Sequence, residues 1–385
     1  MTVSYSPQVI TKNLIMYYDT GNAQKSFKGK PTTNLLPAMG IVGIAGITTA
    51  YVGMDGDWKK YSISGTWANG TYPYCMSVDN YNFIAGTVYS TSCILKTNVL
   101  YKFYYKFEGM NYVNQPMDLG GTSYNVLDPV TQEISVGRYN FAYTATTTQA
   151  GYLINRPLAD GTVFNPATDF IWLKNGQIEQ SAFVTPYTAT SRTTTTALLD
   201  MMNTTTLTAT SLTYAANNVM SFSSGSSYVA ANIPDTTLMA SSWTISMWVK
   251  FTTVNKGSDN MMIQHGVGTV NNGLHLCERG GYTYFGMYGN DTAGTRALSS
   301  GVWYNIVFVY NYNTKAKTIY INGTLDATGG LTGYGGTGSN FMIGGGTIFG
   351  TYVYGDMPIV KMYSTVLSAL EVYQNFSALR GRFGV

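Results

Sequence analysis

The stretch "WYNIVFVYNYNTKAKTIYING", residues 303–323, decides the fold of the C-terminal half of the chain. Successive side chains of an extended backbone point to opposite faces, and here both faces carry β-branched or aromatic bulk. This pattern favours a strand inside a sandwich, covered by a second sheet or by a neighbouring chain. The polar residues 311–317 interrupt the alternation, and residues 318–321 resume it. Asn322 and Gly323 then supply the dipeptide that best accepts the positive φ angles of a type I′ turn, so the stretch predicts a meander of antiparallel strands.

The composition of the 385-residue chain indicates more than one domain and a weakly charged surface. Hydrophobic residues make up 45% of the chain, whereas charged residues make up only 11%, against roughly 25% in a typical soluble protein. The surface must therefore be built from Thr, Ser, Asn, Gly and Tyr. Such a surface suits a chain that packs into a larger assembly or binds sugars. A plain all-β protein is the alternative, because strands select Thr and Tyr in any case.

Charge and cysteine content exclude several classes of partner and cofactor. The net charge of +3 is too small to drive binding to nucleic acid, and the one basic cluster is "KSFKGK" at residues 25–30. Cys75, Cys93 and Cys277 show no CxxC or Cys/His spacing, so we predict no zinc site and no disulfide framework. A bridge between Cys75 and Cys93 stays open. We expect no cofactor.

The N-terminal sequence gives no targeting signal. It lacks a basic start, a long apolar stretch and a cleavage site, and no apolar run elsewhere in the chain is long enough to span a bilayer. We therefore expect synthesis in a cytoplasm and no membrane insertion.

Turn-forming residues divide the chain into four parts. Residues 1–36 form an N-terminal arm or added strand, because their one apolar run is too short for a core. Residues 37–190 hold short alternating runs at the spacing of a β-sandwich. Residues 191–196 are a Thr-rich linker, and residues 197–385 form a second sandwich. The predicted fold class is all-β, with two antiparallel β-sandwich (jelly-roll) domains, the N-terminal arm and one short C-terminal helix.

The C-terminal helix is predicted from a change of period after residue 367. Ser368 and Glu371 form the S-x-x-E capping box, in which each side chain satisfies a backbone N–H of the first turn. Gly381 is expected to stop the helix. The expected buried face consists of Leu370, Tyr373, Phe376 and Leu379.

The last part of the chain resembles a known family. The resemblance rests on "WTISMWVKF" (243–251), "GLHLCERGGYTYFGMYG" (273–289), residues 303–323, "NFMIGGG" (340–346) and "GDMPIVKMYSTVLSALEVYQNF" (355–376). In this order they resemble the strands of a laminin-G-like, concanavalin A-like lectin domain, which implies a β-sandwich. The closing motif departs from the family, because "MPIV" stands where relatives often carry acidic residues.

Three other segments resemble parts of tailed-bacteriophage virion proteins. "NLIMYYDTGNAQKSF" (13–27) and "NFSALRGRFGV" (375–385) are similar to the ends of such proteins. "LKNGQIEQSAFVTPYTATSRT" (173–193) is similar to the last strand and exit of a carbohydrate-binding-module-like jelly roll. The resemblance implies a non-enzymatic virion surface protein, such as a head decoration, collar or tail fibre component. It implies assembly in the host cytoplasm, contacts with other virion proteins (capsid, collar or tail), and a homo-oligomer such as a trimer.

The sequence offers no recognisable catalytic motif. Related sandwiches in glucan hydrolases carry two catalytic carboxylates in an E-x-D-x-x-E strand, and none of the five glutamates here has such a neighbour. We therefore predict that the chain is not an enzyme, and glycan cleavage is the least favoured alternative. His265 and His275 are interpreted as partly buried or surface residues, and the Gly-rich segment 329–340 as a flexible rim loop without a phosphate-binding motif.

Isolated aspartates are weak candidates for calcium, which laminin-G-like domains can hold at a sandwich rim. Asp291, Asp326 and Asp356 lie in such positions. Because an isolated Asp beside glycine is far more often a turn residue, we predict no metal.

Sugar binding is the alternative function, that of an adhesin for host surface glycans. It needs flat aromatic rings beside hydrogen-bonding groups, since pyranose faces stack on rings and hydroxyls take directed bonds. The candidates in the first sandwich are Trp58, Trp67, Tyr72 and Tyr74, near Asp55, Asp57 and Asn69. Those in the second are Tyr282, Tyr284, Tyr288 and Tyr334. Otherwise the tryptophans belong to the core and the tyrosines line an oligomer contact.

Overall fold

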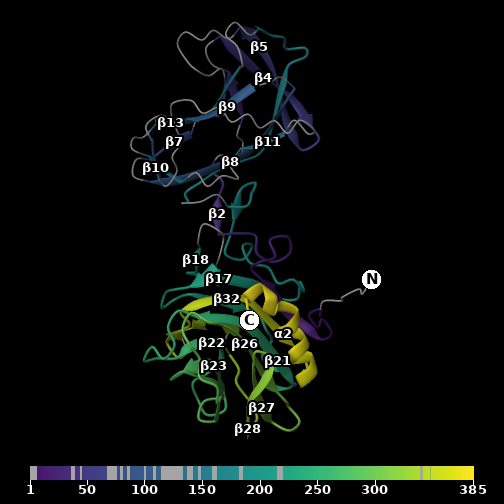
Figure 1. Ribbon diagram of the computed structural model, residues 1–385, viewed down its shortest axis with the longest axis vertical. Coiled ribbons are helices and arrows are strands. Elements are labelled where there is room, and N and C mark those ends of the chain that lie inside the picture. Colours follow the sequence, from purple (N-terminus) through teal and green to yellow (C-terminus); the bar gives the residue numbers. More distant parts are fainter. Residues whose placement is uncertain are drawn as a thin grey trace. The chain divides into compact units, whose positions relative to one another are not determined.

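The chain forms two compact units in the computed structural model, Met1–Pro31 with Thr193–Val385 (unit 1) and Thr32–Arg192 (unit 2) (Figure 1). The residues that the structure describes are 7–35, 40–43, 46–66, 76–78, 81–84, 87–98, 101–106, 110–113, 133–136, 142–145, 149–157, 163–181, 185–214, 220–338, 341–346 and 348–385. Every strand pairing among them is antiparallel, which confirms the all-β fold class.

Unit 1 is a sandwich of two sheets. Sheet A has the order β18 (Thr213–Tyr214), β19 (Met220–Phe222), β32 (Gly355–Tyr363), β21 (Trp243–Phe251), β26 (Trp303–Tyr310), β27 (Ala316–Ile321) and β28 (Thr324–Leu331), with β1 (Leu14–Asp19) also on β32. Sheet B has the order β17 (Leu207–Thr210), β20 (Tyr228–Ala231), β29 (Phe341–Ile343), β22 (Asn260–Gly266), β23 (Gly273–Arg279), β24 (Tyr282–Gly286) and β25 (Asp291–Ala293).

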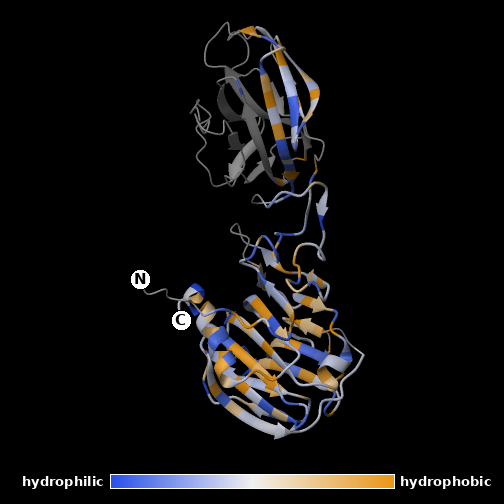
Figure 2. Ribbon diagram, turned by 90° about the vertical axis from the view of Figure 1, so that its right-hand side faces the viewer, coloured by the Kyte–Doolittle hydropathy of each residue, from blue (hydrophilic) through white to orange (hydrophobic). Residues whose placement is uncertain are grey.

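The main core of unit 1 fills the space between the two sheets. Trp243 of sheet A packs against Phe285 of sheet B with ring centroids 5.4 Å apart, and Phe308 meets the same Phe285 edge-on at 5.6 Å. Figure 2 shows hydrophobic residues, in orange, concentrated along these strands. These rings belong to a larger buried cluster of aliphatic and aromatic side chains, and removing that apolar surface from water stabilises the unit.

The stretch 303–323 has the predicted structure. β26 and β27 pair in antiparallel register, with Ile306 opposite Ile321. Alternate residues of β26 face the main core, and Val307 with Val309 packs on the other side of sheet A, so both faces are covered. Asn322 and Gly323 have φ values of 51° and 75°, as a type I′ turn between β27 and β28 requires.

The N-terminal segment adds a strand to sheet A. β1 pairs with β32, with Tyr18 opposite Val360, and Met16 and Tyr18 are fully buried in the main core. The Tyr18 hydroxyl donates a hydrogen bond of 2.9 Å to the carbonyl of Met357. Residues 7–31 are therefore built into the same unit as the C-terminal sandwich.

Helix α2 (Ala369–Phe383) covers the outer face of sheet A, and its capping box forms as predicted. The helix does not stop at Gly381, however, and ends at Phe383 with Gly384 in the left-handed conformation. The expected face was only partly right, because Phe376 is buried and Leu379 packs against the same cluster, whereas Leu370 and Tyr373 are 75% and 49% exposed. A step of three residues falls about 60° short of a full turn, so the predicted positions drift around the helix. Besides Phe376, the buried residues of the helix are Val372 and Asn375.

A second helix, α1 (Asp235–Met239), has five residues and precedes β21. Neither helix is long and apolar enough to cross a membrane, within the part of the chain that the structure describes.

Unit 2 contains two larger sheets and a two-stranded pair. One sheet has the order β10 (Met110–Val113), β12 (Ala142–Ala145), β8 (Val88–Thr97), β15 (Phe170–Glu179), β5 (Trp58–Thr66) and β14 (Val163–Phe164), with β11 (Glu133–Val136) on β8 and β4 (Ile47–Asp55) on β5. The other has the order β3 (Ile41–Gly43), β6 (Met76–Val78), β13 (Gln149–Pro157) and β7 (Tyr81–Phe83), with β9 (Tyr101–Lys106) on β13. The pair is β2 (Thr32–Thr33) and β16 (Ser191–Arg192).

Residues 177–187, within the stretch 173–193 that resembles the exit of a jelly roll, have a structural role. The buried Glu179 carboxylate accepts bonds from the backbone N–H of Thr185 (2.7 Å) and from its hydroxyl (2.8 Å). It also accepts a bond of 2.9 Å from the Thr32 hydroxyl. Gln177 accepts a bond of 2.7 Å from the N–H of Thr188. These bonds fasten the segment after β15 to the strand itself, which explains why the residue types occur at this spacing.

Candidate functional site

The candidate residues of unit 2 do not form a site within the described residues. Trp58 is 7% exposed, and its ring lies beneath the Lys174 ammonium at 4.0 Å, so the indole is a packing residue and not an open stacking platform. Asp55 accepts a bond of 2.9 Å from the indole N–H of Trp172. The candidates Trp67, Tyr72 and Tyr74 lie outside the described residues, as does Cys75 of the open Cys75–Cys93 bridge.

Tyr334 was expected on a rim loop but is only 4% exposed. Its hydroxyl lies 2.7 Å from Nδ1 of His265, whose Nε2 lies 2.9 Å from the Asp235 carboxylate. Asp235 in turn accepts a hydrogen bond from the N–H of Gly338. These contacts hold Tyr334 and Gly338 of the Gly-rich segment against His265 and Asp235. The Tyr334 ring is therefore not available to a ligand. His265 is fully buried, contrary to expectation, and burial lowers its pKa.

The three remaining tyrosines lie on or after β24 and have different surroundings. Tyr282 is exposed at the start of the strand. The Tyr284 ring lies 4.8 Å from the guanidinium carbon of Arg279. Tyr288, 41% exposed, stands in the turn after the strand and lines a pocket of about 380 Å³. Among the candidates that the structure describes, Tyr288 lines this pocket.

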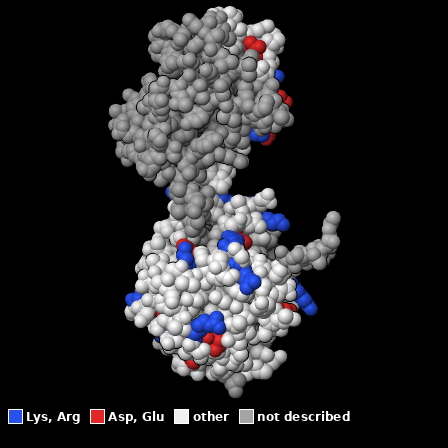
Figure 3. Space-filling model, in the orientation of Figure 1, with Lys and Arg blue, Asp and Glu red and all other residues white. Residues whose placement is uncertain are grey.

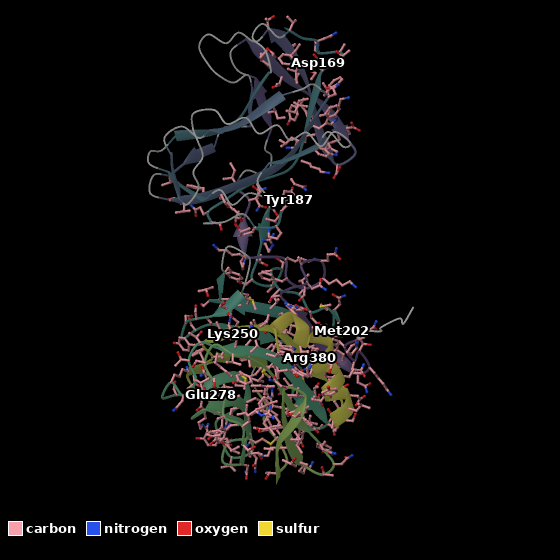
Figure 4. The ribbon with its side chains drawn as sticks, in the orientation of Figure 1. Asp169, Tyr187, Met202, Lys250, Glu278 and Arg380 are labelled. Carbon is pink, nitrogen blue, oxygen red and sulfur yellow. The ribbon has the colours of Figure 1, made fainter. Side chains whose placement is uncertain are left out.

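The pocket opens on the outer face of sheet B. Leu274 and Leu276 of β23 point into the main core, so the alternate residues His275 and Arg279 point outward. In Figure 4 the label of Glu278, the residue before Arg279, marks the position of β23. The lining residues are Ser258, Asp259, Met261, His275, Arg279, Tyr288, Gly289, Asp291, Phe349 and Thr351. They come from the start of β22, from β23, from the turn before β25 and from the segment at residues 349–351.

One wall of the pocket is a chain of charged side chains. Arg279 donates to Asp259 through Nε (2.9 Å) and Nη2 (2.7 Å), in the bidentate geometry that favours this pair, and through Nη1 to Asp291 (3.0 Å). Asp291 also lies 3.1 Å from Nε2 of His275. The hydrogen bond and charge of His275, followed by those of Arg279, outweigh burial and lower the pKa of Asp291 to about 2. Burial would raise the pKa of Asp259, but Arg279 outweighs burial and holds it below its usual value. Both carboxylates are therefore ionised at neutral pH.

The opposite wall is aromatic. The rings of Tyr288 and Phe349 stack with centroids 6.1 Å apart, and Phe349 meets the His275 ring edge-on at 5.3 Å. Glycine makes room for this packing, because a Cβ at Gly286 would collide with the His275 ring. The pocket thus joins a flat apolar surface to a row of fixed donors and acceptors.

Free hydrogen-bonding groups remain on the charged wall. Oδ1 of Asp291 makes no hydrogen bond to any described residue, and the guanidinium of Arg279 uses three of its five N–H groups. A ligand can therefore meet an acceptor and a donor side by side.

Sequence reasoning missed Asp259, Arg279 and Phe349. The spacing of His275 and Arg279, four residues apart on one face of a strand, was the signal that could have found part of the wall.

The aspartates considered for calcium have other partners. Asp356 pairs with Lys250 at 2.8 Å, and Asp326 accepts bonds from the backbone N–H groups of Thr295 and Arg296. No group of three His, Cys, Asp or Glu side chains that could hold a metal ion occurs among the described residues. Cys277 is a buried free thiol, and burial raises its pKa.

Comparison with known proteins identifies the fold of the region that contains the pocket. Residues 223–373 match the family described as the concanavalin A-like lectin/glucanases superfamily. No curated protein matches the sequence.

Similar solved structures have low sequence identity. They include the binding domain of Paraclostridial Mosquitocidal Protein 1 (18% identity, 46% of this chain, 49% of that chain, TM-score 0.37) and the receptor binding domain of botulinum neurotoxin type G (14%, 46%, 48%, 0.37). A third is the carbohydrate-binding module CBM40 of the Ruminococcus gnavus IT-sialidase bound to α2,3-sialyllactose (22%, 36%, 82%, 0.30). The chain spans about half the length of the first two. At these TM-scores the likeness carries no argument about function.

Proposed function

We propose that this protein is a non-enzymatic carbohydrate-binding protein and that the pocket beside Tyr288 holds a sugar. The observation that carries the proposal is the pairing of an exposed aromatic ring with the free oxygen of Asp291 and the free N–H groups of Arg279. The lectin-like family match of residues 223–373 supports the same function.

The chemistry of a sugar fits both walls. Two neighbouring hydroxyls of a pyranose can meet the charged wall together, one donating to Oδ1 of Asp291 and the other accepting from Arg279. The apolar C–H face of the ring can lie on Tyr288, whose exposed area is flat and apolar. A volume of about 380 Å³ is at the small end of ligand pockets, which suits one or two sugar residues.

The charged wall also argues against hydrolysis. A glycosidase needs one carboxyl group that is protonated at working pH to act as general acid. The pKa of Asp291 is lowered mainly by its hydrogen bond to His275, and that of Asp259 by Arg279, so neither carboxyl group holds a proton near neutral pH. The geometry supports recognition, because neither carboxyl group that lines this pocket can serve as the protonated acid of a glycosidase.

Titration calorimetry of the full chain with glycans selected on a glycan array tests the proposal. We expect Tyr288→Ala and Asp291→Asn each to weaken binding by about tenfold or more, because the first removes the stacking ring and the second replaces a charged acceptor by a neutral amide. Tyr282→Ala is the matched control, since Tyr282 has similar exposure and lies outside the pocket lining. Equal binding by the Tyr288→Ala variant, or equal losses in the control, would reject the pocket as the sugar site.

We further propose that the protein is displayed on the surface of a tailed-bacteriophage virion after assembly in the host cytoplasm. Support comes from residues 13–27 and 375–385, whose sequences resemble virion proteins. These segments meet in unit 1, where Arg382 donates a bond of 2.6 Å to Asp19. The sparse charge of the surface seen in Figure 3 suits packing among other virion proteins and into a homo-oligomer such as a trimer.

Immunogold microscopy of purified particles, with an antibody against residues 200–385, tests the virion proposal. Label on the head or collar would indicate decoration, and label at fibre tips would indicate adhesion. Particles without label, in a lysate that contains the folded protein, would contradict it.

A further inference from the structure

An apolar shelf lies at the mouth of the pocket. It consists of Val270, Tyr288 and Phe349. Val270 is 59% exposed and stands in the turn between β22 and β23. Exposed apolar side chains that cluster beside a pocket, instead of being scattered singly, indicate a contact with a ligand.

The shelf is continuous with the aromatic wall. A Cβ built at Gly289, which lines the pocket, would lie 3.5 Å from a methyl group of Val270. A Cβ built at Gly268, next to Val267, would lie 3.6 Å from the Tyr288 ring and 3.9 Å from the Phe349 ring. Val270 therefore extends the apolar surface outward from the two rings.

Backbone hydrogen bonds hold the shelf in place. The N–H of Val267 donates to the carbonyl of Asn272 (2.9 Å), and the N–H of Asn271 donates to the carbonyl of Tyr288 (3.1 Å). The N–H of Gly335 donates to Asn271 at 3.1 Å. A turn fixed in this way presents its apolar side chains at little cost in conformational entropy, which favours their use in binding.

We propose that this shelf receives a methyl group carried by the bound sugar, so that the pocket selects sugars with an acetamido or a 6-deoxy methyl group. This inference rests on the proposed function, because the charged wall must hold the ring before the shelf can meet its substituent. A plain hexose can lay its C–H face on Tyr288, but its hydroxyl substituents would leave the exposed side chain of Val270 in water. A methyl group removed from water against valine is favourable by about fourfold in affinity.

Matched sugar pairs test the inference. Titration of the full chain would compare methyl N-acetyl-β-glucosaminide with methyl β-glucoside, and methyl α-L-fucoside with methyl α-L-galactoside. We expect the methyl-bearing member of at least one pair to bind about fourfold more tightly or better. The pair that shows the preference distinguishes an acetamido from a 6-deoxy substituent.

Val270→Ser should remove most of that preference and leave the affinity for the plain hexose unchanged. Val302→Ser is the control, because Val302 is also exposed but lies away from the pocket lining, and thermal unfolding would verify that both variants fold. Equal affinities within both pairs would contradict the proposed binding of a methyl group by the shelf, without contradicting the proposal that the pocket binds a sugar. No binding by any of the four sugars would overturn both proposals.

Discussion

Replacing Lys361 with methionine should stabilise unit 1 and remove part of its pH dependence. Lys361 lies on β32, on the face of sheet A that α2 covers, and the residue is fully buried. Its ammonium nitrogen makes no hydrogen bond to any described residue, and the nearest recorded ring, that of Tyr17 on β1, is 5.9 Å away. The nearby Asp19 carboxylate is bonded to Arg382. A buried charge without a close partner destabilises the folded state.

The magnitude follows from the pKa of Lys361. Burial lowers it from 10.5 to about 7, against the opposing effect of Asp19. Between these values the unfolded chain binds more protons than the folded chain, so the free energy of unfolding should rise by about 1.4 kcal/mol for each pH unit from 7 to 10. Below pH 7 both states are protonated and the destabilisation is largest, at most about 5 kcal/mol. Methionine keeps the length and apolar stem, so Lys361→Met should gain about 2 to 5 kcal/mol at pH 7.

Urea unfolding at pH 6.5, 8 and 9.5, followed by tryptophan fluorescence, measures both effects. Trp248 stacks on Phe383 of α2 at 4.1 Å, so its emission reports the docking of the helix. Lys25→Met is the control, because Lys25 is exposed in the same unit. A variant less stable than the wild type at pH 6.5, or equal pH slopes in variant and wild type, would refute the reasoning.

Three further predictions concern single contacts. Gly286→Ala should cost about 1 to 3 kcal/mol in thermal unfolding and weaken sugar binding, since the new methyl displaces the His275 ring; unchanged affinity would contradict this. Glu179→Gln should destabilise unit 2 by about 1 to 3 kcal/mol in urea unfolding, because an amide N–H would face the donors of Thr185. An unchanged unfolding midpoint would show that the bonds between Glu179 and Thr185 do not stabilise the unit. Asp291 has a folded pKa of about 2 against an ordinary 3.8, so its stabilisation is present above pH 4 and is lost as the pH falls toward 2. Asp291→Asn should reduce the loss of unfolding free energy between pH 4 and pH 2. An acid transition equal to that of the wild type would show that the contacts of Asp291 with His275 and Arg279 do not stabilise the fold.

The parts of the fold that local sequence determines were predictable. Alternation in residues 303–310, the turn at Asn322 and the capping box at Ser368 each depend on neighbours within a few positions, and the structure confirms them. The end of α2 was not predictable in the same way. Gly381 lies in the last turn with open space around it, where glycine can stay helical at a cost of only about 1 kcal/mol.

The candidate site was predictable only in its aromatic part. Tyr288 could be chosen because a tyrosine in a Gly-rich turn is commonly exposed. The charged wall depends on the register of β22, β23 and β25, which brings Asp259 and Asp291 to Arg279 from positions 20 and 12 residues away. Tyr334 shows the opposite case. Its glycine-rich surroundings favour a rim loop, but a tertiary contact with His265 buries the ring.

A crystal structure of the full chain with its best-binding glycan tests the central claim most directly. The account predicts electron density for a sugar between the Tyr288 ring and the guanidinium of Arg279, with a hydroxyl within hydrogen-bond distance of Oδ1 of Asp291. Sugar density bound elsewhere on the protein, with this pocket holding only solvent, would contradict it.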